Sequence, residues 1–240
     1  MKTEGYPLNW YQLETTDRSR MYSFLARYLR EPVNALTHLA GVLLSVVALI
    51  LLIMRSIEAG SMAMLAAFSV FGVSMILLYI SSTLYHSIQS SWDTIKKLRK
   101  LDHMMIYVLI AGTFTPFCLV VIGGLPGIIL LSIMWTMALI GIFMKLLMGG
   151  VAGWLSISIY IVMGWTGLAL IPLMIDSMPL SGLIWMGIGG VIYTGGAVIY
   201  GLGKPDPIPN RFGYHEIWHL FVLGGTFSHF WAVYQYVAVV

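Results

Sequence analysis

Two histidines with helical spacing carry the strongest chemical signal in this sequence. His215 and His219 are four residues apart, which places two side chains on one face of an α-helix, about 6 Å apart along its axis. Three neutral imidazoles and an open water position make a typical catalytic zinc site. His86 could supply the third imidazole, and Ser82 precedes it by the same spacing of four. The pattern therefore predicts a zinc site at His86, His215 and His219.

A carboxylate is the second requirement of such a site, and Asp102 is the candidate. It could accept a hydrogen bond from a zinc-bound water and help to deprotonate it, because zinc lowers the pKa of that water to about 7. A simpler alternative is that Asp102 pairs with Lys100 or Arg99. Cys118 is the single cysteine, so a histidine-bound zinc is favoured over iron–sulfur or cysteine-rich sites.

Other polar residues have structural interpretations. We expect His103 to pack beside the basic segment next to it, and His229, ten residues beyond His219, to make a structural hydrogen bond. Glu31 precedes Pro32, and this pair is typical of a helix start that the glutamate caps.

The segment from His215 to His219 also matches the zinc-protease pattern H-E-x-x-H, in which Glu216 would be the general base. The extended pattern needs a histidine at position 225, which is Gly225, and no Asp or Glu follows Glu216. An intramembrane protease is therefore the minor hypothesis, although Glu216 could still face the site.

The composition indicates what must position these residues. The chain has 240 residues with 13 Lys+Arg and 10 Asp+Glu, so that 10% are charged and 59% are apolar, whereas a soluble domain is about 25% charged. Mean hydropathy is +0.87. A soluble or disordered protein is excluded, and long unbroken apolar runs favour membrane-spanning helices over a β-barrel.

The charge-free stretches predict an all-α membrane protein, a bundle of seven transmembrane helices. A helix needs about 20 residues to cross the hydrocarbon core. The stretch 103–144 fits two spans joined at a Gly/Pro break, and each of the other five fits one. We expect a tail over residues 1–30 and one transmembrane domain over 31–240, with spans at about 33–54, 62–86, 102–123, 127–146, 153–173, 181–202 and 213–236.

Lysines and arginines set the expected orientation. With seven spans, 12 of the 13 lie on one side and Arg55 alone on the other. The positive-inside rule then places the N-terminus in the cytoplasm and the C-terminus outside. His38, His86, His103, His215 and His219 would all lie near the inner face, so four spans would bring polar groups to one depth.

In this order, the motifs resemble those of the hemolysin III family, in the progestin and adiponectin receptor (PAQR) superfamily. The matching features are Ser82-x3-His86 ending span two, Asp102 opening span three and His215-x3-His219 opening span seven. Glu31, Asn34 and His38 also resemble the family's Glu-x2-Asn-x3-His motif. The resemblance implies zinc held by the three histidines, with Asp102 contacting the zinc-bound water. Glu216 is outside the family pattern.

The leading hypothesis is a zinc-dependent membrane hydrolase of lipid amide (ceramide-like) or ester bonds, since the superfamily includes alkaline ceramidases. Ser82 would hydrogen-bond the water or the oxyanion. There are two alternatives. One is a receptor or membrane-stress sensor with structural zinc, and the other is a haemolysin acting as a permeability factor. The expected location is the cytoplasmic membrane. Membrane lipid is the expected partner, and neither nucleic acid nor a soluble partner is indicated.

Overall fold

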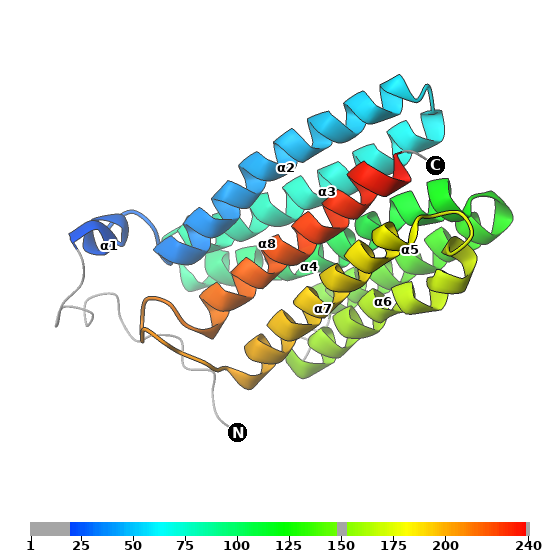
Figure 1. Cartoon of the computed structure of the whole chain (residues 1–240). Coiled ribbons are helices and arrows are strands. Elements are labelled where there is room, and N and C mark those ends of the chain that lie inside the picture. The colour runs from blue at the N-terminus through cyan, green and yellow to red at the C-terminus, as the bar shows by residue number, and fades with distance from the viewer. Residues whose placement is uncertain (1–19, 148–152, 239–240) are drawn as a thin grey trace.

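The computed structural model describes residues 20–147 and 153–238. Over these residues the chain folds into a bundle of seven long helices, preceded by a short helix (Figure 1). The helices are α1 (Arg20–Leu25), α2 (Pro32–Glu58), α3 (Met62–Ser87), α4 (Trp92–Pro116), α5 (Gly124–Leu147), α6 (Gly153–Met174), α7 (Leu180–Leu202) and α8 (Tyr214–Ala232), with π-helical turns η2 (Phe117–Ile122) and η3 (Val233–Val237).

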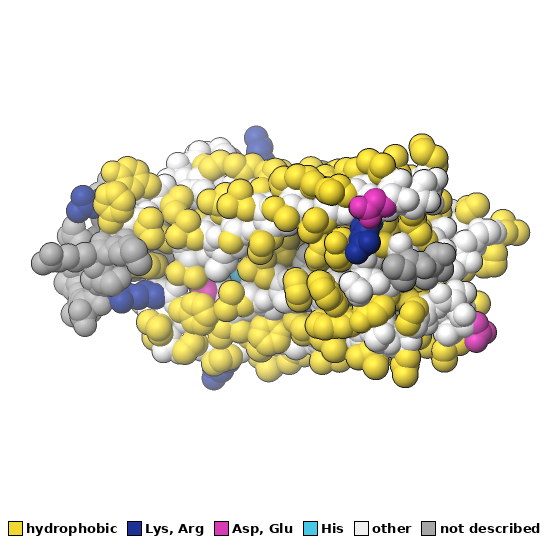
Figure 2. Space-filling view, turned by 45° about the horizontal axis from the view of Figure 1, so that its top comes forward, with side chains coloured by type: hydrophobic (Ala, Val, Ile, Leu, Met, Phe, Trp, Pro, Cys, Tyr) yellow, Lys and Arg dark blue, Asp and Glu magenta, His cyan; other side chains and the backbone are white. Residues whose placement is uncertain are grey.

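The predicted fold class is confirmed. Six of the helices, α2 to α7, are long and apolar enough to cross a membrane, and α8 is the seventh member of the bundle. Hydrophobic side chains cover most of the face seen in Figure 2, as expected for a surface that contacts lipid. The direction in which the bundle crosses the membrane stays a prediction.

Helix α4 differs from the sequence expectation at both ends. It begins at Trp92, ten residues before the predicted span 102–123, because the Ser91 side chain accepts a hydrogen bond from the Thr94 backbone N–H at 3.4 Å and the helix runs on through the basic segment. The sequence estimate followed the apolar run, whereas helical hydrogen bonding does not stop at the edge of the hydrocarbon. After Pro116 the helix widens into η2, since proline cannot donate a helical hydrogen bond.

Helix α8 packs against α2 and α7 and contacts α3 through side chains (Figure 1). The Tyr79 hydroxyl of α3 donates a hydrogen bond to the Thr226 hydroxyl of α8 at 2.9 Å, and the Tyr193 hydroxyl of α7 lies 2.7 Å from the same oxygen. At the C-terminal end of α3, the Glu31 backbone N–H bonds to the His86 carbonyl at 2.9 Å. Asn34 of α2 donates to Glu216 at the start of α8 at 2.8 Å. These two contacts hold the start of α2, the end of α3 and the start of α8 together.

Candidate metal centre

Three histidines from two helices converge at the end of the bundle where α3 ends and α8 begins. His86, His215 and His219 each offer a ring nitrogen, and these atoms all lie within 4.8 Å of one another. The ring centroid of His86 lies 5.1 Å from that of His215 and 4.7 Å from that of His219. The structure thus brings together the three residues that the sequence analysis selected, in a cluster small enough for one metal ion.

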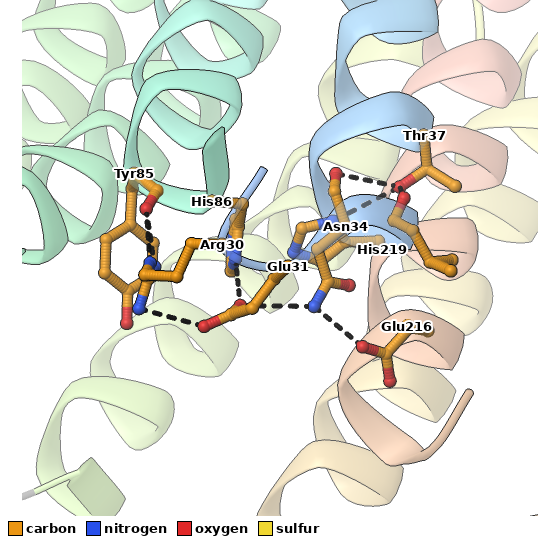
Figure 3. Close-up of polar contacts among 9 residues, drawn as sticks. Arg30, Glu31, Asn34, Thr37, Tyr85, His86, Glu216 and His219 are labelled. Carbon is orange, nitrogen blue, oxygen red and sulfur yellow. Dashed lines mark hydrogen bonds and ion pairs between the residues drawn. The ribbon is translucent and has the colours of Figure 1, made fainter. Parts of the chain in front are cut away.

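Glu31 fixes the ring of His86 (Figure 3). His86 Nδ1 contacts Glu31 Oε2, and Arg30 holds the other carboxylate oxygen of Glu31 at 2.9 Å. Burial raises the pKa of Glu31, but the hydrogen bond with His86 and the positive charge of Arg30 outweigh it and lower this pKa to about 2. An ionised Glu31 accepts the Nδ1 proton, as carboxylates behind metal-binding histidines commonly do.

The expected capping role of Glu31 is wrong. Glu31 occupies the N-cap position of α2, but its side chain makes no capping hydrogen bond. The carboxylate turns instead to the imidazole and guanidinium beside it, which are stronger partners than a backbone N–H.

One ring nitrogen of His86 is available to bind a metal ion. His86 is fully buried, and its Nε2 has no hydrogen-bond partner among the described residues. A buried nitrogen with an available lone pair is costly unless something binds it. With two further imidazoles close by, the donor set fits zinc.

His219 is fixed from the side of α2. Its Nδ1 lies 3.5 Å from the Thr37 hydroxyl (Figure 3). The ring of His38 stacks on it, with centroids 3.6 Å apart and planes at 11°. His38 is therefore a packing neighbour of the cluster and lies outside the group of three.

The Glu216 carboxylate makes structural hydrogen bonds. Its Oε1 accepts a hydrogen bond from the Asn34 amide at 2.8 Å, and its Oε2 accepts one from the Gly213 backbone N–H at 2.8 Å. The first bond joins α8 to α2 (Figure 3), and the second lies at the start of α8, so both oxygens have a partner. Asn34 is buried at this joint and also approaches Glu31 Oε2 at 3.4 Å.

Asp102 and Ser82 lie beside the histidines on the wall of a cavity of about 540 Å³. His215 and His219 line the same cavity, and the Ser82 hydroxyl interacts with the Asp102 carboxyl. Lys100, one alternative partner of Asp102, instead donates to the Leu146 carbonyl at 3.4 Å. The site thus places two imidazoles, a carboxyl and a hydroxyl on the wall of a mainly apolar chamber, with the third imidazole, that of His86, next to them.

The two remaining histidines also line this cavity. The backbone carbonyl of His103 accepts a hydrogen bond from Tyr160 at 2.8 Å. The structural hydrogen bond expected for His229 is absent at Nδ1, which has no partner among the described residues. The ring of His229 stacks on Tyr193 instead, with centroids 5.7 Å apart.

Sequence reasoning missed three residues of this region. Thr37 was passed over because a threonine one helical turn from a conspicuous asparagine carries no signal of its own. Arg30 contributed only to the count of positive charges on the cytoplasmic side, although it adjoins Glu31. Lys145 was counted in the same way, yet it is buried and lines the cavity. Its position as the one charge between residues 103 and 175 was the available signal.

Comparison with known proteins identifies the family. Residues 26–230 match the family model described as "Haemolysin-III related". The chain belongs to the haemolysin III family. It is 42% identical over 206 residues to the "Hemolysin-3 homolog" of Bacillus subtilis (strain 168), covering 86% of this chain and 93% of the relative. It is 40% identical over 224 residues to the "Hemolysin-3" of Bacillus cereus, covering 93% and 97%.

A more distant relative connects this haemolysin III protein to the PAQR superfamily. The human "Monocyte to macrophage differentiation factor" is 29% identical over 177 residues, which cover 70% of this chain and 69% of the relative. With its apolar helices, the haemolysin III protein is a multi-pass protein of the cell membrane.

Proposed function

We propose that this protein is a zinc-dependent hydrolase of lipid amide or ester bonds. The observation that carries the proposal is the position of the histidine cluster, at one end of a largely apolar cavity that also contains a carboxyl and a hydroxyl. A substrate with a polar carbonyl group and a long apolar chain would match both parts of this cavity, the polar end and the apolar remainder.

His86, His215 and His219 would hold the zinc ion, with Glu31 orienting His86. Zinc bound there would supply a Lewis acid that polarises the scissile carbonyl and makes water more acidic. Asp102 takes a proton from the attacking water and passes it to the leaving amine or alcohol. Once Asp102 has taken this proton, the Ser82 hydroxyl is released from the carboxyl and donates a hydrogen bond to the carbonyl oxygen, on which negative charge develops.

The rest of the cavity suits an acyl or alkyl chain. Three glycines on its wall, Gly164 of α6 and Gly187 and Gly190 of α7, face open space, since a Cβ added at any of them would meet no atom within 4 Å. Apolar residues of α4, α6 and α7 form most of the remaining wall. A chain placed there removes apolar surface from water, which favours binding.

The decisive experiment measures zinc and turnover together in detergent-purified protein. We expect about one zinc per chain by elemental mass spectrometry and hydrolysis of a ceramide or a lipid ester. The double variant His86→Ala/His215→Ala is expected to lose both. Asp102→Ala should keep the zinc and lose turnover, and full activity in that variant would contradict the mechanism.

The names of the bacterial relatives favour testing a second function, cytolysis. A haemolysin acting as a permeability factor would release dye from liposomes whether or not the three histidines are present. Leakage that persists in His86→Ala/His215→Ala, without lipid hydrolysis, would favour this function over the hydrolase.

A further inference from the structure

Lys145 is a cation whose side chain points into the protein. It lies two residues before Leu147, the last residue of α5, yet it is only 7% exposed and lines the cavity. A lysine near the end of a membrane span usually extends its amine outward to the headgroups and water. Lys145 does not follow this rule, so its burial needs an explanation within the helix bundle.

The pairing of α4 with α5 sets this direction. The Lys100 amine of α4 donates to the Leu146 carbonyl of α5 at 3.4 Å. Gly141, one helical turn before Lys145, packs directly on the ring of Tyr107 of α4. Residues one turn apart share a helix face, so Lys145 faces α4 near His103, and the charges of Lys145 and Arg99 act on each other.

The amine of Lys145 has no counter-charge within the part of the chain that the structure describes. Among the described residues, no carboxylate lies within 4 Å of it and no hydrogen bond of its amine is found. The charged residues of the cavity wall are Arg99, Lys145 and Asp102, so cations exceed carboxylates there. A buried cation without a partner is unfavourable, and an anion that enters the cavity would remove this cost.

We propose that Lys145 and Arg99 form a phosphate-binding site at the histidine end of the cavity, which receives the phosphate group of a lipid whose chain occupies the apolar part. Arginine and lysine together suit a phosphate, because the guanidinium donates in pairs and the ammonium supplies a compact charge. The inference rests on the proposed function only in placing a lipid in the cavity, and it narrows the substrate to lipids that carry phosphate.

The test compares three probes by isothermal titration calorimetry in a neutral maltoside detergent: dodecyl phosphate, dodecanol and inorganic phosphate. The full-length protein is used as purified, because any binding to a metal at the histidines is shared by the wild type and the Lys145 variants and cannot account for a difference between them. We expect dodecyl phosphate to bind about tenfold more tightly than dodecanol. Lys145→Gln should abolish this preference, and Lys145→Arg should retain most of it.

The matched control is Lys97→Gln, which removes one positive charge from an exposed position of α4 outside the cavity. It should bind like the wild type. The proposal is overturned if the wild type shows no preference for dodecyl phosphate, or if Lys145→Gln keeps it. Inorganic phosphate binding as tightly as dodecyl phosphate would retain the anion site and show that the lipid assignment is wrong.

These results are separate from the outcome of the hydrolase test. A protein without zinc or turnover could still show the Lys145-dependent preference, and then only the proposed function would fail. A zinc hydrolase in which Lys145→Gln binds dodecyl phosphate normally would retain the proposed function and lose the phosphate site.

Discussion

The histidine end of the cavity and its glycine wall keep their shapes by different means. At the histidine end, side chains from α2, α3 and α8 hold one another through hydrogen bonds and an ion pair, as with Glu31, His86 and Arg30. At the glycine wall, formed by Gly164, Gly187 and Gly190, the shape comes from missing side chains. One end is built for fixed geometry, and the other leaves room for a flexible chain.

This difference leads to different expected sensitivities. Loss of a polar partner that contacts a metal-binding histidine misplaces that ligand, whereas a change at the glycine wall alters only the space available. The predictions below test this contrast in decreasing order of expected effect.

Removing the charge behind His86 should weaken metal binding most. Glu31→Gln replaces the carboxylate that accepts the Nδ1 proton, so zinc affinity should fall about 10- to 100-fold. Competition with a chelator of known affinity measures this. The control Glu58→Gln changes a glutamate at the far end of α2, which pairs with Arg55 at 3.6 Å. Equal zinc affinity in Glu31→Gln and the wild type would show that the histidine end does not depend on this contact.

Filling the glycine wall should change chain-length selectivity and leave the metal in place. Gly190→Leu adds a side chain to open space, so kcat/KM for a long-chain substrate should fall about tenfold relative to a short-chain one. Val198→Leu is the control, because Val198 lies on the same helix and is 50% exposed away from the cavity. An equal loss for both chain lengths would contradict the assignment of this wall to the chain.

Removing the Glu216 side chain should affect stability alone. Glu216→Ala loses the bonds to Gly213 and Asn34, which should lower the free energy of unfolding by about 1–2 kcal/mol. Thermal unfolding, zinc content and turnover are measured in parallel, with the exposed Asp176→Ala as control. Loss of turnover with zinc retained would instead support a general-base role for Glu216, as in the protease hypothesis.

The sequence was informative where one helix contains the whole pattern. His215 and His219 are close in any helix, so their pairing required no knowledge of the fold. Asp102 and His86 came from different spans, and they were selected because both fall near the ends of spans on one face. The role of Glu31 could not be inferred in this way, since its partner His86 is 55 residues away and its own neighbour Pro32 suggested a cap.

The fold class followed from the sequence by itself, because backbone groups in hydrocarbon must be satisfied within each segment and long apolar runs then form helices. The direction in which side chains point was decided only by the tertiary structure. Lys145 faces α4 instead of the surface, Glu216 bonds to Asn34, and Gly164 and Gly190 face a common cavity. The rotation of each helix about its own axis depends on contacts with all its neighbours, and no local pattern specifies these contacts.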